Sequence, residues 1–354
     1  MFKPHIRHIQ FYPRILNNGN MSKPLLLAPM AELSHRALRE LIEGFKPGAD
    51  DYFSEMISAG ALVSGGPFEK WYTDKGPCPE KLVYQLVGGN EDHLCQAAAL
   101  LDRENCLGID INMGCSAPAI TRTGAGVQWM ACPDKAGALI RKIRPLVSRR
   151  LSVKLRAGLE DNSPTILENL VLFCRRLEEE GVDLITLHPR TSREKFKRKA
   201  RWEYISALRK ELRIPLAGNG DISSAGEILS RSRVCDAVMI GRLAVRQPWV
   251  FSEARRLEKP SEKATDSMSE DGMSEDLVKE TGLRFLELLA KYQPPEFHLS
   301  RAKRFFSYFC DNLFWGNHVK NLINRESDLA GIERAWALSF PSCLETTIQT
   351  TLWE

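Results

Sequence analysis

Four short apolar segments between residues 151 and 242 decide the fold: LSVKLRAG (151–158), LITLHPR (184–190), IPLAGNG (214–220) and DAVMIGR (236–242). Stretches with the apolar spacing of amphipathic helices separate them, such as PTILENLVLFCRRLEEEG and AGEILSRS. Short strand-like segments that alternate with helices are typical of a parallel sheet with helical crossovers. These segments therefore predict repeated β/α units.

The same alternation extends back to residue 24. Four more segments share its character: PLLLAPM (24–30), YFSEMI (52–57), LVYQLVG (82–88) and GIDINMG (108–114). Eight such units within ~230 residues predict a (β/α)8 TIM barrel, which typically takes ~250 residues. A doubly wound sheet is the competing architecture, but no GxGxxG follows the first strand, which counts against a dinucleotide-binding unit.

Composition and charge set the domain plan. The chain has 354 residues, with 49 Lys and Arg against 45 Asp and Glu, and 43% are hydrophobic, which excludes a disordered chain. Residues 258–276 hold seven acids and two lysines without apolar periodicity and predict a solvated linker. We expect an N-terminal tail at 1–22, with Met21 as a candidate true start. A catalytic barrel at 23–257, the acidic linker and an all-helical domain at 277–354 would follow.

Cysteine spacing and hydrophobic run lengths indicate the class of protein. The nine cysteines are scattered, without CxxC or other metal-ligand spacing, as expected for reduced thiols in a cytosolic protein. No apolar run reaches the ~18 residues of a membrane span. The first twenty residues lack the apolar core of a secretory signal. We expect a cytoplasmic monomer that binds neither metal nor membrane.

Chemically capable residues stand at nearly every predicted strand end. They are Met30, Glu55, Gln85, Asn112 with Cys115, Lys154 with Arg156, His188 with Arg190, Asn219 with Asp221, and Arg242. One such residue is usually just a solvated or hydrogen-bonded group. In a barrel, however, all C-terminal strand ends converge on one face, where the site lies. The pattern therefore predicts one shared site.

The predicted site has donors for an anion and for a flat heterocycle. The turns AGNGDISS and MIGRLAV each open a helix, so their backbone N–H groups and Arg242 could bind a phosphate. Alternatively, the glycines merely permit tight turns. Gln85, Lys154 and His188 could hydrogen-bond a heterocycle and stabilise negative charge, as near N1 of a reduced flavin. The alternative for Lys154 is a buried ion pair with Glu55 or Asp110.

Cys115 differs from most of the other cysteines because it lies in a Gly-, Ser- and Pro-bearing loop, INMGCSAPAITRTGAG, after the fourth strand. Most others lie in apolar helical stretches, where thiols are usually buried. A thiol is mostly protonated at neutral pH and can donate a proton. Deprotonated, it could be a nucleophile instead. Spacing does not separate these two roles.

The motifs together resemble the tRNA-dihydrouridine synthase family throughout residues 24–250. The matching segments are APMA (28–31), SEMISA (54–59), QLVG (85–88), DINMGC (110–115), GAG (124–126), VKLRAG (153–158), HPRT (188–191), GNGDI (218–222) and MIGR (239–242). HLSRAKRFFSYF (298–309) is similar to the C-terminal helical domain of the bacterial synthases, closest to the C-type branch. The set is specific, although each motif alone is weak.

The resemblance implies an FMN enzyme that reduces selected uridines in tRNA with NADPH as reductant. It implies that Cys115 donates the proton to C5 of uracil while reduced flavin gives hydride to C6. The implied flavin-binding residues are Pro29, Met30, Ala31, Gln85, Lys154, His188, Asn219, Gly220, Asp221, Gly241 and Arg242. The implied substrate-binding residues are Asn112, Arg156 and Arg190.

A basic run supports RNA as the partner. A stacked uracil must be flipped out to reach a barrel mouth, at an unstacking cost that phosphate contacts can offset. Six of the nine residues from Arg193 to Arg201 are basic, and the run follows the predicted strand that ends in HPR. Arg301, Lys303 and Arg304 in the helical domain indicate the same contact. The alternative is that these basic residues form solvated surfaces and do not contact RNA.

Three positions depart from the family pattern. Ser116 replaces the usual Pro after the cysteine, Ala119 replaces a Lys associated with RNA or base, and Phe196 replaces a common Tyr. Arg122 and Lys195 are candidate compensating cations. Two other functions stay open: an FMN barrel that reduces a free pyrimidine, and a tRNA-binding protein with impaired catalysis.

Overall fold

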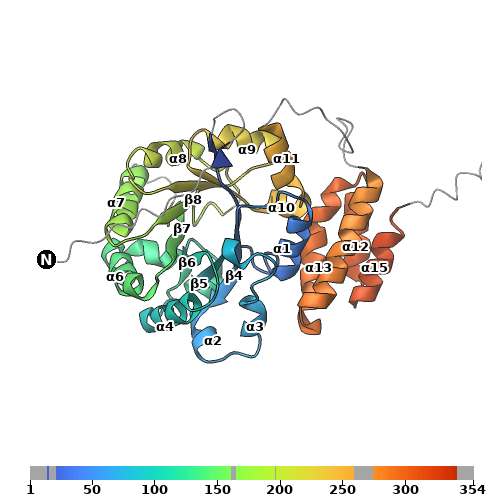
Figure 1. The fold of residues 1–354 in the computed structure, drawn as a ribbon, viewed down its shortest axis with the longest axis horizontal. Coiled ribbons are helices and arrows are strands. Elements are labelled where there is room, and N and C mark those ends of the chain that lie inside the picture. Colours follow the sequence, from blue (N-terminus) through green and yellow to red (C-terminus); the bar gives the residue numbers. More distant parts are fainter. Residues whose placement is uncertain (1–13, 16–20, 161–164, 196, 259–273, 341–354) are drawn as a thin grey trace, which may run out of the picture.

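Eight parallel strands form a closed barrel (Figure 1). The computed structural model describes residues 14–15, 21–160, 165–195, 197–258 and 274–340. The barrel strands are β3 (Leu25–Leu27), β4 (Asp51–Ser58), β5 (Leu82–Val87), β6 (Gly108–Met113), β7 (Arg150–Gly158), β8 (Leu184–Thr191), β9 (Leu216–Asn219) and β10 (Ala237–Ile240). Each strand pairs with its sequence neighbour, and β10 closes the ring on β3. The predicted TIM barrel is confirmed, because each strand lies within or overlaps a predicted segment.

Helices surround the strands on the outside of the barrel (Figure 1). The larger ones are α1 (Arg36–Gly44), α4 (Glu91–Asp102), α6 (Pro133–Ile143), α7 (Ile166–Glu179), α8 (Trp202–Arg209), α9 (Ala225–Ser232) and α11 (Val250–Leu257). The shorter ones are α2 (Ala59–Val63), α3 (Glu69–Tyr72), α5 (Pro118–Thr121) and α10 (Arg242–Arg246). Asn90 caps α4 and Ser224 caps α9 through their side-chain oxygens, as such residues commonly do.

Two apolar cores follow from the alternation of side chains along the strands. Leu25 and Leu27 of β3 belong to the large core between strands and helices, whereas Leu26 belongs to a second, smaller core. Because successive strand residues point to opposite faces, the smaller core fills the barrel interior. Its other buried members are Ala28, Phe53, Val83, Leu184, Ala217, Ala237 and Met239. The interior of the barrel is therefore filled by apolar side chains.

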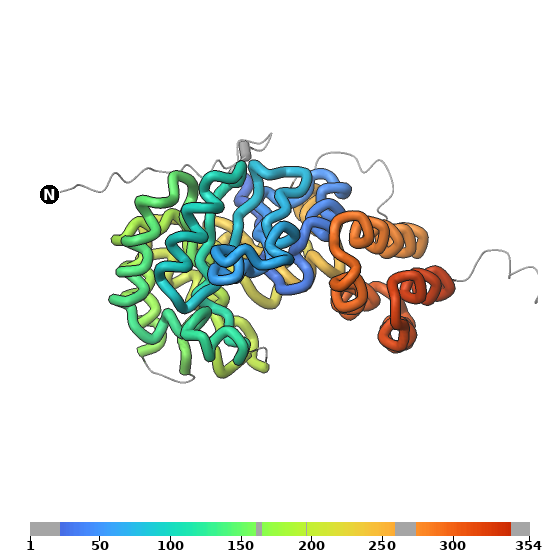
Figure 2. Tube along the Cα trace, turned by 90° about the horizontal axis from the view of Figure 1, so that it is seen from below, coloured from blue at the N-terminus to red at the C-terminus, as the bar shows by residue number. Residues whose placement is uncertain are grey.

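The C-terminal helices form a separate bundle at one side of the barrel (Figure 2). They are α12 (Glu275–Tyr292), α13 (Pro295–Phe309), α14 (Gly316–Arg325) and α15 (Leu329–Ala337). The rings of Phe285 and Phe305 stack with centroids 3.7 Å apart, and Trp336 packs on Phe306 at 4.8 Å. Helix α12 packs against α1, and α13 packs against α10. The predicted helical region is thus present, and it contacts the barrel directly.

The predicted tail and linker are only partly described. Arg14–Ile15 (β1) pairs antiparallel with Met21–Ser22 (β2), next to the start of the barrel. Most of the predicted acidic linker lies outside the described residues, and α12 begins at Glu275, inside the predicted linker range. The predicted domain boundaries therefore stay predictions. In the part of the chain that the structure describes, no helix has the length and hydrophobicity to cross a bilayer.

Candidate functional site

A cavity of about 410 Å³ lies among the residues at the C-terminal ends of the strands. Its lining residues are Ala28, Pro29, Met30, Ala31, Leu33, Met56, Asn112, Gly114, Cys115, Lys154, Arg156, His188, Arg190, Asn219, Gly220, Asp221, Ile222, Met239, Gly241, Arg242, Arg304 and Tyr308. All predicted site residues except Glu55 and Gln85 line this cavity. Cavities of a few hundred Å³ with convergent polar groups are typical of small-molecule and cofactor sites.

Gln85 lies beneath the cavity rather than in its lining. Its side chain is fully buried, its Nε2 donates to Asp110 Oδ2 at 2.7 Å, and its Oε1 accepts from Asn112 Nδ2 at 2.9 Å. Ser152 Oγ donates to the other oxygen of Asp110 at 2.6 Å. Direct contact of Gln85 with a flavin stays a prediction. What Gln85 does here is fix the amide of Asn112.

Asn112 in turn fixes the loop that carries Cys115. Its Oδ1 accepts hydrogen bonds from Gly114 N–H at 3.1 Å and Cys115 N–H at 2.9 Å. The Cys115 carbonyl accepts from Val127 N–H at 2.9 Å, so both sides of the residue are held. Burial raises the pKa of Asp110 to about 6, although the hydrogen bonds from Ser152 and Gln85 oppose that shift. A buried polar network therefore positions the thiol from below.

Lys154 is a half-buried cation in the cavity wall. Burial lowers the pKa of Lys154 from 10.5 to about 8, and the charge of Arg156 adds to this effect. Asp110 and Cys115 act in the opposite direction. The alternative of a buried ion pair with Glu55 or Asp110 is wrong, since Lys154 makes neither pair within the described residues and Glu55 pairs with Arg301. Lys154 is a mostly protonated lysine that an anion would stabilise.

Arg156 is anchored at the rim by backbone carbonyls. Its Nε donates to Gly114 O at 2.9 Å and its Nη1 to Thr191 O at 3.1 Å. Its charge, like that of Lys154, interacts with Cys115. The fixed guanidinium and the thiol are thus held in one corner of the cavity.

His188 is a neutral imidazole in a defined tautomer. Burial lowers the pKa of His188 far below its usual value, and the positive charges of Lys154, Arg156, Arg190 and Arg242 lower it further. Arg190 Nη1 lies 3.1 Å from His188 Nε2. Because an arginine only donates, Nε2 must accept, and Nδ1 carries the hydrogen. At neutral pH His188 can donate a hydrogen bond but carries no charge.

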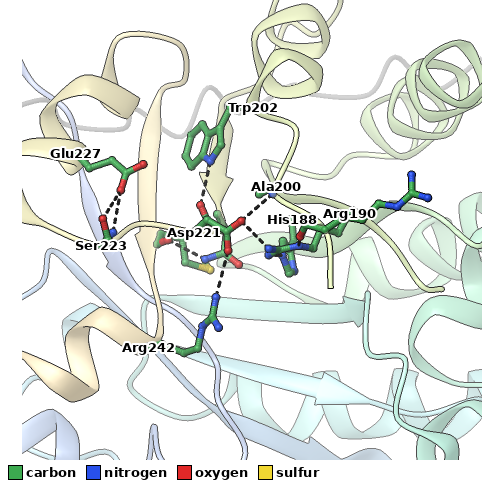
Figure 3. Close-up of polar contacts among 12 residues, drawn as sticks. His188, Arg190, Ala200, Trp202, Asp221, Ser223, Glu227 and Arg242 are labelled. Atoms are coloured by element: carbon green, nitrogen blue, oxygen red, sulfur yellow. Dashed lines mark hydrogen bonds and ion pairs between the residues drawn. The ribbon is translucent and has the colours of Figure 1, made fainter. Parts of the chain in front are cut away.

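Asp221 organises the side of the cavity formed by β8, β9 and β10 (Figure 3). Its Oδ2 accepts from Arg190 Nη2 at 2.5 Å and from Ala200 N–H at 2.7 Å, and its Oδ1 accepts from Arg242 Nη2 at 3.2 Å. Burial alone would raise the pKa of Asp221, but the hydrogen bonds from Arg190 and Ala200 and the charges of Arg190 and Arg242 together lower it. The carboxylate therefore stays ionised and aims two arginines.

The turn at Gly220 requires glycine. Gly220 has φ +128°, and an added Cβ would lie 3.0 Å from Ala200 Cβ and from His188 Cδ2. Its carbonyl accepts from Trp202 Nε1 at 2.9 Å, which closes the turn from the other side (Figure 3). Gly241 is the residue directly before α10, as predicted for a glycine that opens a helix. An added Cβ at Gly241 would make only ordinary contacts, so tight packing does not require that glycine.

The sequence did not predict the apolar wall of the cavity or the contribution of the helical domain to its lining. Leu33, Met56, Ile222 and Met239 line the cavity, but an apolar residue at a strand end carries no distinguishing signal. Arg304 and Tyr308 of α13 also line it; their sequence neighbourhood had indicated only RNA contact.

Two cations of the basic run after β8 form ion pairs within the chain. Arg201 pairs with the buried Glu194 at 2.7 Å, and Arg193 pairs with Glu160 at 2.8 Å. The remaining described cations of the run are exposed: Lys195, Lys197, Arg198 and Lys199. The predicted departure at Phe196 lies outside the described residues.

Comparisons with known proteins show which family the chain resembles. A sequence model of the family described as "Dihydrouridine synthase (Dus)" matches residues 26–329. A "Probable tRNA-dihydrouridine synthase" of Aquifex aeolicus is 34% identical over 65% of this chain and 72% of its own length. One of Rickettsia conorii is 26% identical over 94% of this chain and 97% of its own. A "tRNA-dihydrouridine synthase B" of Pasteurella multocida is 30% identical over 72% of this chain and 76% of its own. The predicted C-type branch stays a prediction.

Proposed function

The chain belongs to the dihydrouridine synthase family, and from that premise we propose that it reduces selected uridines of tRNA to 5,6-dihydrouridine, with FMN as cofactor and NADPH as reductant. The observation that carries the proposal is the position of Cys115, which shares the wall of the cavity at the barrel mouth with Lys154 and Arg156. A proton donor and two cations then surround one reaction volume.

The lining of the cavity offers the apolar wall and the cations that FMN would need. Ala28 and Met30 in the segment after β3, together with Met239 of the neighbouring β10, form an apolar wall against which a flat ring system can pack. Strand β7, across the barrel, contributes Lys154, whose pKa is lowered by burial and by the charge of Arg156, so a bound anion would stabilise its charged form. Arg242, held by Asp221, would take the phosphate, so we assign Asp221 an indirect role there.

The protein groups complete the reduction that the cofactor begins. Bound FMN, once reduced by NADPH, would supply the hydride for C6 of uracil. Cys115 would donate its proton to C5, which saturates the C5–C6 bond and leaves a thiolate that regains a proton from water. Lys154 and Arg156 would stabilise that thiolate, because an opposite charge nearby favours the ionised form. Asn112 would hold the Cys115 loop at its working distance.

The exposed cations beside the mouth would hold the RNA while one base enters the cavity. Lys195, Lys197, Arg198 and Lys199 follow β8, and Arg304 approaches from the helical domain. Phosphate contacts of this kind offset the cost of unstacking the flipped base. This arrangement favours an RNA substrate over a free pyrimidine.

Replacement of Cys115 by alanine tests the proposal. Cys115→Ala should retain FMN and NADPH-dependent bleaching of the flavin, but lose dihydrouridine formation by about 10²-fold or more, the usual contribution of a general acid. Cys132→Ala is the matched control, because that cysteine is free and exposed. The measurement is dihydrouridine in tRNA incubated with each purified protein. Unchanged product from the Cys115 variant would refute the proton-donor role, and a parent protein that cannot take up FMN would refute the flavin function.

A further inference from the structure

A buried ion pair joins the helical domain to the barrel. Arg301 of α13 places Nη2 2.9 Å from Glu55 Oε2 of β4, and the two side chains are only 2% and 3% exposed. The Arg301 guanidinium also lies over the ring of Phe297, 4.5 Å from its centroid, and 5.6 Å from that of Tyr72. Its Nη1 donates to the Gln293 side chain. Arg301 is therefore held in one orientation toward Glu55.

The other oxygen of Glu55 holds a strained turn in the cavity wall. Glu55 Oε1 accepts a hydrogen bond from the Glu32 N–H at 2.6 Å. Glu32 has φ +63°, a left-handed conformation that residues other than glycine adopt at a cost. It directly follows Pro29, Met30 and Ala31, which line the cavity. The turn thus depends on an external acceptor for its amide.

The charge of Arg301 favours the ionised form of this acceptor. Burial raises the pKa of Glu55, and the charge of Arg301 is the strongest influence that opposes the rise. The nearby Arg39 is engaged elsewhere, because its Nη1 donates to Ser34 O and its Nη2 to Asp74 O. A hydrogen bond to a carboxylate is stronger than one to a neutral carboxyl group. Without Arg301, Glu55 would hold the Glu32 amide less firmly.

We propose that the helical domain shapes the cofactor cavity through this ion pair, with Arg301 and Glu55 acting as positioning residues for the Pro29–Glu32 turn. The identity of the group that the turn contacts rests on the proposed function. The link itself does not, because it consists of contacts within the chain. The helical domain would then contribute to cofactor retention as well as to RNA binding.

Amide hydrogen exchange tests the link without any ligand. We compare the parent with Arg301→Gln, Arg301→Lys, Glu55→Gln and the double glutamine variant, following a peptide that spans residues 29–34. The Gln variants should exchange roughly tenfold or more faster there, and Lys should restore most of the protection. Residues 151–158 in β7 serve as the internal reference and should not change. Arg284→Gln is the matched control, since Arg284 forms an exposed pair on α12.

Cofactor affinity provides the second readout. The Kd for FMN, from quenching of flavin fluorescence, should rise by roughly fivefold or more in each single Gln variant. In the double variant the Kd should be no higher than in the single variant that binds FMN more weakly, since the two changes break one link. Faster exchange confined to α13, or equal exchange of all segments, would overturn the proposal. So would an Arg301→Gln protein with unchanged exchange at 29–34. If the parent binds no FMN, the proposed function fails, while the exchange result still decides the link.

Discussion

Replacement of Lys154 by methionine should stabilise the cofactor-free protein while weakening its cofactor site. Lys154 stands in the cavity wall, and burial lowers its pKa from 10.5 to about 8. Below pH 8 the lysine is protonated in both the folded and the unfolded states, so the folded protein bears the full cost of a charge in a poorly solvated place. Methionine has a similar length and no charge, and it therefore removes that cost.

The pKa shift sets the size of the effect and its pH dependence. One pKa unit corresponds to ~1.4 kcal/mol, so the shift implies about 3 kcal/mol, and about 2 kcal/mol if water in the cavity solvates the ammonium group. Between pH 8 and 10.5 the unfolded chain binds more protons than the folded one, so the parent gains stability as pH rises. At pH 9.5 the advantage of Lys154→Met should have fallen to about 1.5 kcal/mol or less.

Urea unfolding of FMN-free protein at pH 7 and pH 9.5 measures this advantage. Lys210→Met is the control, because Lys210 is exposed at the end of α8, and its effect should stay within ~0.5 kcal/mol at both pH values. The Kd for FMN should rise in Lys154→Met and not in the control. A variant that is less stable than the parent at pH 7, or an advantage that grows with pH, would refute the reasoning.

Two further predictions concern a turn and a surface. Gly220→Ala should lower the free energy of unfolding by about 1–3 kcal/mol because of the positive φ and the close contacts at this position. Gly226→Ala in α9, where a Cβ has open space, should raise the free energy of unfolding by up to ~1 kcal/mol. Urea unfolding of both variants measures the difference. Alanine at Lys197, Arg198 and Lys199 should weaken tRNA binding and reduce the salt dependence of log K by up to about 0.9 per lost duplex phosphate contact. An unchanged slope of log K against log salt concentration would show that Lys197, Arg198 and Lys199 are solvated and do not contact the RNA.

Much of the fold could be predicted because strand and helix periodicity are local properties. The segment DAVMIGR predicted strand β10 and the glycine before α10, and IPLAGNG predicted the turn at Gly220. Local patterns did not reveal the short strands β1 and β2, which lie within the predicted N-terminal tail, because two-residue strands are too short for an apolar alternation. Closure of the barrel makes separate strand ends neighbours, so Cys115, Lys154 and Asp221 could be assigned to one site from topology alone.

Gln85 shows where strand-end reasoning stops. Its position near the end of β5 predicts a cavity residue, yet it is buried below the cavity and bonded to Asp110 and Asn112. Whether a polar strand residue faces a ligand or a neighbouring side chain depends on which neighbours can satisfy it. That depends on register between strands, which a single strand does not encode.

By itself, the sequence determined the barrel, the helical region and most of the polar cavity lining, since each follows from periodicity and from motifs within a few residues of one another. Only the tertiary structure decided the pairing of Glu55 with Arg301, the placement of Arg304 and Tyr308 in the cavity, and the neutral state of His188. These depend on burial and on distances between residues far apart in the chain. Desolvation and charge pairing act through space, and no local pattern records them.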